Sequence, residues 1–328
     1  MHPELFKIPF INVTLWTYGL MMVIGFLVAV FVIRRLSRDI TPDPQLITNA
    51  ALYSLIAGVV GARIFYVVHH FDQFRGRPFS FFAIWTGGLE LLGGVILAII
   101  VIFWFLLYHK LAVRRYLDIL AVGLMAALVF GRIGCFMRGC CFGKPANVPW
   151  AVCFPYGSDA YYSQVYPNLK RDRLEPHLQL PPAFFDEFGG LKQYDLLTEE
   201  QKEQVDNGPY RCLPVHPTQL YSSANAALCG LILYLFWKRS KKAEKSRKRK
   251  LFARPGSTFA LMFILYGIAR FLIEMLRDDN PFEHSWWIIY KGGTVSQSLC
   301  LYLVILGVIL MVVFQKMKPD KLAVRAAK

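Results

Sequence analysis

LLGGVILAIIVIFWFLLY, residues 91–108, is an apolar stretch without a single charged side chain. As an α-helix rising about 1.5 Å per residue, it spans most of the ~30 Å hydrocarbon core of a bilayer. Six similar stretches, three of which carry an arginine near one end, are Leu15–Ile33, Leu220–Trp237, Val295–Phe314, Leu46–Val68, Ile119–Met137 and Ser257–Leu276. The sequence therefore predicts an all-α polytopic membrane protein with about seven transmembrane helices.

The composition agrees with this class, because 55% hydrophobic residues and a mean hydropathy of +0.39 exceed what ordinary soluble domains contain. The first twelve residues are mixed in polarity, and no small-residue cleavage site follows the first span. We therefore expect the first span to be a retained helix and not a cleaved signal peptide.

Basic residues predict the orientation. More than half of the 37 Lys and Arg residues lie in segments expected on one side, which are 34–38, 110–115, 238–254 and 316–328. Because basic loops stay on the cytoplasmic side, the N-terminus is predicted outside and the C-terminus in the cytoplasm. The run KRSKKAEKSRKRK, residues 238–250, is interpreted as a topology anchor, with RNA or anionic-lipid binding as the alternative. No nucleic-acid partner is expected.

The expected organisation has four parts. Transmembrane helices one to four fill residues 1–137, with an outer-face interfacial segment at 69–86 that is rich in aromatic residues. Residues 138–217 are rich in Pro, Tyr and acidic groups and should form a small external α/loop subdomain. Helices five to seven follow in 218–316, with a basic cytoplasmic loop at 238–254, and 317–328 form a cytoplasmic tail.

Polar residues inside the predicted spans share one depth. Three arginines lie five or six residues before the outer end of outward-running helices, about 8 Å below the surface. Other polar residues begin the inward-running helices at the same level; the set is Arg63, Arg132, Arg270, Tyr18, Glu90, Gln219 and Tyr221. Charge inside a membrane is costly and usually functional, and guanidinium groups match phosphate oxygens. Alternatively, Arg63 snorkels outward, or Arg270 pairs with Glu274 one turn later.

Four motifs surround these residues: GRIGCFMRGCCFGKP at 131–145, PVHPTQLYSS at 214–223, YGIARFLIEMLR at 266–277 and WTGGLELLGG at 85–94. In their order along the chain, these motifs resemble the prolipoprotein diacylglyceryl transferase family, over nearly the whole chain from Tyr18 onward. The resemblance implies transfer of the diacylglyceryl group from phosphatidylglycerol to the thiol of the lipobox cysteine of bacterial prelipoproteins, with release of glycerol phosphate. It implies a bacterial cytoplasmic (inner) membrane enzyme whose partners are phosphatidylglycerol, prelipoprotein signal peptides and membrane lipids.

The resemblance also implies residue roles. Arg132 and Arg270 match the family's essential arginines and would bind and stabilise the phosphate. Tyr18, Glu90 and His216 complete the expected catalytic set. The expected phosphatidylglycerol-binding set comprises both arginines together with Arg63, Gly143, Gln219 and Tyr221.

One departure leaves the activation of the thiol open. Many members have a histidine in a His-Gly-Gly element, where this chain has Leu92. Glu90 and His216 are the available bases, although Glu90 equally fits an arginine partner. A cationic surround lowers the pKa of a thiol from about 8.5, which reduces the need for a strong base. The alternatives are a catalytically silent relative that binds lipid or prelipoprotein, and, less favoured, an anion or lipid transporter, since the inner halves of the spans are nearly uncharged.

The cysteines do not have the spacing of a zinc site, and no metal or organic cofactor is expected. Cys135 and Cys140 stand where the family often has asparagine and glutamate. A disulfide among Cys140, Cys141, Cys153 and Cys212 is one interpretation, and small buried thiols are the other.

Overall fold

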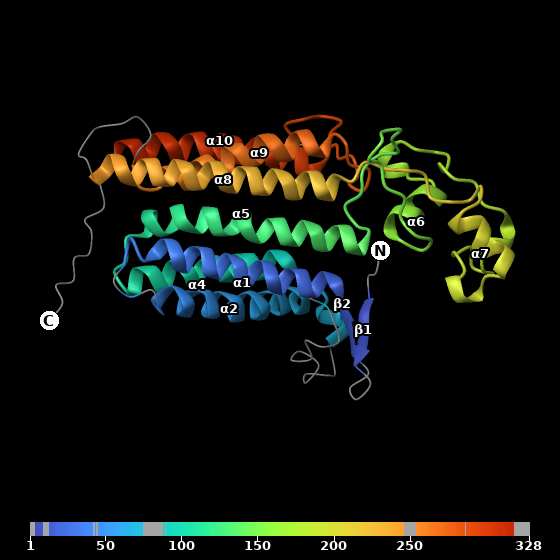
Figure 1. Ribbon diagram of the computed structural model, residues 1–328, viewed down its shortest axis with the longest axis horizontal. Coiled ribbons are helices and arrows are strands. Elements are labelled where there is room, and N and C mark those ends of the chain that lie inside the picture. Colours follow the sequence, from blue (N-terminus) through green and yellow to red (C-terminus); the bar gives the residue numbers. More distant parts are fainter. Residues whose placement is uncertain are drawn as a thin grey trace.

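The computed structural model describes residues 4–8, 13–41, 43, 45–74, 88, 90–245, 254–285 and 287–317. Long helices form an elongated bundle, and residues 139–217 form a separate subdomain at one end of it (Figure 1). Most of the expected interfacial segment at 69–86, the later part of the basic loop at 238–254 and nearly all of the tail at 317–328 lie outside the described residues.

The long helices match the predicted spans one for one. They are α1 (Thr17–Ser37), α2 (Gln45–His69), α4 (Leu91–Tyr108), α5 (Val113–Arg138), α8 (Thr218–Lys245), α9 (Ser257–Glu274) and α10 (Val295–Lys316). Six of them are long and apolar enough to cross a membrane, and α4 is a shorter apolar helix. Large apolar side chains such as Phe31 and Trp104 point out of the bundle, as the hydrocarbon of a bilayer requires. The predicted fold class is confirmed.

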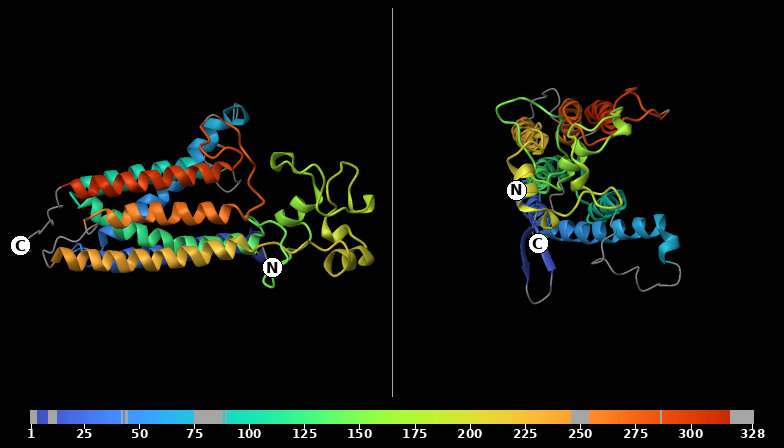
Figure 2. Two further views of the ribbon diagram at one scale, coloured as in Figure 1. Left: turned by 90° about the horizontal axis from the view of Figure 1, so that it is seen from above. Right: turned by 90° about the vertical axis from the view of Figure 1, so that its right-hand side faces the viewer.

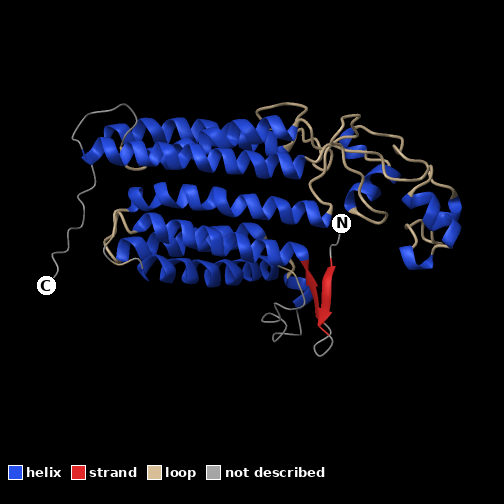
Figure 3. Ribbon diagram, viewed as in Figure 1, coloured by secondary structure: helices blue, strands red, loops and turns tan. Residues whose placement is uncertain are grey.

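A small hairpin precedes the first helix and was not predicted. Strands β1 (Glu4–Ile8) and β2 (Val13–Trp16) lie side by side (Figure 3). They pair antiparallel, with Phe6 opposite Leu15. Leu15 and Trp16 had been assigned to the first span because β2 runs directly into the apolar stretch of α1. Hydropathy alone does not separate a short strand from the helix that follows it.

Helix α5 lies at the centre of the bundle. It packs against α1 on one side and against α8 and α9 on the other, while α2 packs on α4 and α9 on α10 (Figure 2). Lipid is as apolar as a side chain, so membrane helices gain most from close backbone approach at small residues. At the α2–α4 contact a Cβ on Gly61 would lie 2.5 Å from the carbonyl oxygen of Gly93, so only glycine fits there.

The subdomain of residues 139–217 contains α6 (Asp159–Val165), α7 (Glu199–Asp206) and the 3-10 turns Leu169–Arg171, Pro182–Phe184 and Tyr194–Leu196. It has its own apolar cores, one around Phe154 and Tyr161 and one around Phe184. Arg173 Nη1 lies 3.0 Å from Asp278 Oδ2, which ties the subdomain to the α9–α10 connection. A short helix, α3 (Phe71–Phe74), follows α2.

Candidate active site

The loop after α5 is clamped between two other helices. Helix α5 ends at Gly139, whose φ of 84° turns the chain and directs its N–H to the carbonyl of Cys135 at 3.0 Å. The N–H of Gly143 then donates to the His216 carbonyl at 3.1 Å, and that of Lys144 to the Leu276 carbonyl at 2.8 Å. A Cβ on Gly143 would lie 2.5 Å from the His216 oxygen. This glycine, quoted in the 131–145 motif, therefore lets the loop pass between the start of α8 and the end of α9.

Two buried side chains of α8 fix the same loop. Thr218 Oγ1 donates to the Cys141 carbonyl at 2.7 Å, and Gln219 Nε2 donates to the Cys140 carbonyl, also at 2.7 Å. The Gln219 amide nitrogen thus contacts the backbone of the loop, and the role of Gln219 in binding phosphatidylglycerol stays a prediction. The direct contacts of Gln219 position the turn that carries the two cysteines.

Helix α9 contributes a buried ion-pair cluster. Arg270 Nη1 lies 2.5 Å from Glu274 Oε2, so the pairing one turn later is present. The Glu274 side chain is completely buried and also accepts from Thr294 Oγ1 at 3.0 Å and from Asn280 Nδ2. Arg277, which the sequence analysis did not single out, lies 3.7 Å from the same carboxylate and pairs with Asp279. Arg277 lies three residues after the end of α9, where its backbone N–H donates to the Glu274 carbonyl at 3.1 Å.

Arg132 differs from these arginines because no carboxylate partners it. Its guanidinium forms no hydrogen bond or ion pair with any residue in the described ranges, yet it is half-buried in α5. It interacts electrostatically with Arg277, and Arg270 interacts with both of them. The nearby carboxylates, those of Glu274 and Asp279, already pair with other arginines, namely Arg270 and Arg277. An unneutralised arginine inside a bundle beside two others makes a strong site for an anion.

An apolar cavity of about 310 Å³ lies between α1, α2, α4 and α5, where the turns of α5 that precede Arg132 line it from Tyr116 to Ala127. Its lining includes Met22, Phe26, Ile33, Ile47, Leu106 and Leu120. Met22 Sδ lies 3.7 Å from the Cβ position of Gly131, the residue before Arg132. One turn before Met22, the ring of Tyr18 approaches the Cβ position of Gly134 to 3.3 Å. The structure therefore places Tyr18 next to the helical turn that carries Arg132, and Met22 is the lining residue through which the cavity approaches that turn.

Arg63 and Glu90 form a second group, at the junction of α2 and α4. Arg63 is only 7% exposed, and its Nη1 donates to the Gly88 carbonyl at 3.0 Å. Its guanidinium also lies over the Phe74 ring at 5.4 Å. The Glu90 carboxylate lies 2.7 Å from His69 Nδ1. These contacts are local, and Leu92 beside them is 62% exposed on the surface of α4.

His216 and Tyr221 form a third group, at the start of α8. The His216 Nδ1 atom lies 3.2 Å from the Tyr221 hydroxyl, which also accepts a hydrogen bond from Trp150 Nε1 at 2.6 Å. Trp150 was not among the predicted site residues, because nothing in its local sequence links it to the start of α8. The predicted residues thus lie in three groups, of which the one around Arg132 and Arg270 carries the strongest positive charge.

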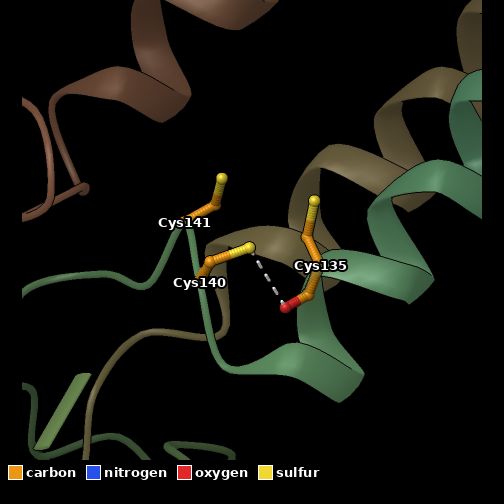
Figure 4. Close-up of side chains that lie close together, drawn as sticks. All are labelled: Cys135, Cys140 and Cys141. Carbon is orange, nitrogen blue, oxygen red and sulfur yellow. Dashed lines mark hydrogen bonds between the residues drawn. The ribbon is translucent and has the colours of Figure 1, made fainter. Parts of the chain in front are cut away.

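Three cysteines gather where the loop leaves α5. The Sγ atoms of Cys135, Cys140 and Cys141 all lie within 4.8 Å of one another, in a triangle (Figure 4). The Cys140 thiol donates to the Cys135 carbonyl at 3.7 Å. Hydrogen bonds from the Cys135 and Cys140 thiols lower the pKa of Cys141, and the charges of Arg277 and Arg132 lower it further. All seven cysteines are free, so the disulfide interpretation is not realised in this structure.

Comparison with known proteins gives a consistent picture. A family model described as "Prolipoprotein diacylglyceryl transferase" matches residues 3–313. A phosphatidylglycerol–prolipoprotein diacylglyceryl transferase of Clostridium tetani is 26% identical, covering 94% of this chain and 96% of the relative. Proteins with the same name from Burkholderia ambifaria and Nitratidesulfovibrio vulgaris are 28% and 29% identical. The two alignments cover 92% and 88% of this chain, and 91% and 86% of the respective relatives.

Proposed function

Because this chain belongs to the prolipoprotein diacylglyceryl transferase family, we propose that it transfers the diacylglyceryl group of phosphatidylglycerol to the thiol of a prelipoprotein cysteine. The acceptor would be the lipobox cysteine of a signal peptide, and the second product would be glycerol phosphate. The single observation that carries the proposal is Arg132, an arginine with no carboxylate partner among the described residues, on a helix whose preceding turns line an apolar cavity.

That arrangement suits both ends of one phospholipid. The phosphate would lie between Arg132 and Arg270, and Arg270 would keep its ion pair with Glu274. The acyl chains would extend into the cavity between α1, α2, α4 and α5, whose lining is almost wholly apolar. A soluble phosphate ester would use the arginines and leave the cavity unfilled, so a lipid uses more of the site.

The reaction makes particular demands on these side chains. The acceptor sulfur forms a bond to the glycerol carbon that bears the phosphate ester, while the bond from that carbon to the ester oxygen breaks. Negative charge accumulates on the departing phosphate, and preorganised cations lower the barrier by stabilising it. We assign this role to Arg132 and Arg270, with the Tyr18 hydroxyl as a supporting donor.

The remaining predicted residues have supporting roles in this proposal. Gly143 and Gln219 hold the loop, and Arg63 stabilises the junction of α2 and α4 next to the lipid site. Glu90 and His216 are the two candidate bases, and each already contacts a neighbour, His69 or Tyr221. Tyr221 would bind substrate only through its hydroxyl group, which already contacts His216.

We place the protein in the cytoplasmic membrane of a bacterium with its N-terminus outside and its C-terminus in the cytoplasm. The concentration of basic residues in the loops at 34–38, 110–115 and 238–254 supports this orientation. The subdomain of residues 138–217 would then lie on the outer side, where it would meet the acceptor. The arginine cluster would lie in the outer leaflet, at the depth of the phospholipid headgroups.

The test is a transfer assay with purified protein in phosphatidylglycerol-containing nanodiscs and a lipobox-cysteine peptide. We expect the peptide to gain the mass of a diacylglyceryl group while glycerol phosphate appears in equal amount. A peptide with serine in place of the cysteine is the matched control and should gain no mass. If neither product forms while phosphatidylglycerol still binds, and an active relative works in parallel, the chain is a silent member of the family.

A further inference from the structure

The three-cysteine triangle is not explained by lipid binding. Cys135 lies in the last turn of α5, and Cys140 and Cys141 lie in the loop that Gly139 turns back toward that helix. The spacing in sequence does not suggest a metal site, but the turn brings all three sulfur atoms to one place. Figure 4 shows Cys140 pointing toward Cys135, with Cys141 completing the triangle.

The backbone around the triangle is fixed in advance. The carbonyls of Cys140 and Cys141 are held by Gln219 and Thr218, each at 2.7 Å. Cys141 has a φ of 59°, a left-handed conformation that is unfavourable for a residue other than glycine. Such strain persists only where the surroundings impose it, and it is concentrated at functional sites. The turn therefore holds both thiols on the side of the loop that faces Cys135.

The triangle has the dimensions of a metal site. Zinc binds thiolate sulfur at about 2.3 Å, so three sulfur atoms around one ion lie about 4 Å apart. The three Sγ atoms lie within 4.8 Å of one another, so a shift of a few tenths of an ångström at each would bring them to bonding distance. Three soft thiolates favour Zn²⁺ or Cu⁺ over Mg²⁺ or Ca²⁺, which prefer oxygen ligands.

The site has three protein ligands and not four. Among the described residues, no further His, Cys, Asp or Glu joins the group. Structural zinc sites are closed by four protein ligands, whereas catalytic ones keep a position open for water or substrate. Three thiolates and a divalent ion carry a net negative charge. Arg132 and Arg277, which interact electrostatically with Cys141, supply compensating positive charge.

We infer that Cys135, Cys140 and Cys141 hold one thiophilic divalent cation, of the Zn²⁺ class, whose open position binds the acceptor thiol. This inference rests on the proposed function for the identity of the acceptor. It accounts for Leu92, which cannot accept a proton: a thiol bound to a metal ion is deprotonated without a histidine base. It also places the attacking sulfur beside the arginine cluster, where the phosphate would lie.

The transfer of the diacylglyceryl group requires no reagent other than the phospholipid and the acceptor thiol. The acceptor thiol binds the cation as thiolate and its proton goes to solvent. A sulfur electron pair then forms the bond to the glycerol carbon as the bond between that carbon and the phosphate oxygen breaks. Glycerol phosphate leaves with the electron pair of the broken bond. The thioether product is a weaker ligand than a thiolate, so it dissociates and the open position is restored.

The experiment measures metal and acceptor binding separately from transfer. Wild-type protein, purified under reducing conditions, is analysed for bound metal and then loaded with Co²⁺, whose absorption reports thiolate ligands and coordination number. C135S and C141S are compared with C153S, which removes a thiol outside the triangle. We expect one Zn²⁺ per chain and a thiolate-to-cobalt absorption band in the wild type and in C153S, and neither in the other two variants.

The lipobox-cysteine peptide should shift the Co²⁺ spectrum of the wild type, and the serine peptide should not. Chelation should slow transfer by about 10²-fold, the contribution of an activating group, and Zn²⁺ should restore it.

The inference is overturned if folded wild-type protein binds neither Zn²⁺ nor Co²⁺ through thiolates, or if Cys135, Cys140 and Cys141 are isolated as a disulfide. If the metal binds but the peptide does not shift the Co²⁺ spectrum, the site is structural, and the inference that the metal binds the acceptor thiol is wrong. Transfer without metal would overturn this inference alone, whereas a peptide-responsive metal without transfer would overturn the proposed function.

Discussion

The replacement Gly143→Ala tests whether the clamp around the 139–145 loop is necessary for the site. The added methyl group would lie 2.5 Å from the His216 carbonyl oxygen and 2.9 Å from that of Leu276. Both atoms belong to backbone, so no side-chain rotation relieves the contact. Overpacking of this kind costs about 1–3 kcal/mol.

Relief of the contact would require the loop to move away from α8 or α9. Movement would weaken the hydrogen bonds of Gly143 to His216 and of Lys144 to Leu276, each worth about 1 kcal/mol. The expected loss in the free energy of unfolding is therefore about 3–5 kcal/mol. Because the same loop carries Cys140 and Cys141, we also expect transfer to fall by more than about tenfold, which corresponds to 1.4 kcal/mol in the barrier.

Gly131→Ala is the matched control, since it lies in the same motif next to Arg132. Its methyl group would meet only the flexible Met22 side chain, at 3.7 Å. Thermal unfolding and the transfer rate are measured for both variants in the same nanodiscs. The control should resemble the wild type in both measurements. If Gly143→Ala unfolds at the wild-type temperature and keeps full activity, the loop is not clamped as described.

The other predictions concern charge and the missing base. Arg132→Ala should lower transfer by about 10²-fold or more with little change in thermal stability, because the guanidinium has no hydrogen bond or ion pair with the described residues; a large fall in melting temperature would contradict this. Glu274→Gln should destabilise the protein by about 3 kcal/mol by leaving the buried Arg270 without its carboxylate, whereas Glu283→Gln, which removes a carboxylate that pairs with no arginine among the described residues, should change the melting temperature little. Leu92→His should raise the transfer rate far less than the ~10²-fold that a required base contributes, and a full gain of that size would show that thiol activation is lacking in the wild type.

The membrane part of the fold could be predicted because each helix carries its own signal. An uncharged apolar run has one stable solution in a bilayer, so every predicted span corresponds to a helix. The β1–β2 hairpin could not be predicted, since its second strand is continuous with the apolar run of α1. Within the site, Arg270 and Glu274 are one helical turn apart, so their pairing followed from spacing alone.

Long-range contacts could not be read in the same way. The role of Gln219 depends on a loop 79 residues earlier in the chain, and the Trp150–Tyr221 hydrogen bond joins residues 71 apart. The cysteine triangle depends on a left-handed turn at Gly139, which converts an unremarkable spacing into a cluster. No local pattern specifies which surface a loop of this kind meets, because that is decided by the packing of α8 and α9.

The two arginines of the site differ in how they can enter the bilayer during biosynthesis. Arg270 and Glu274 belong to the same helix, so α9 can bring its cation and the matching anion into the translocon together, before any other helix has packed. Arg132 has no such companion on α5, and its partial burial is completed by helices synthesised later. Helix α5 therefore inserts at a higher cost than α9.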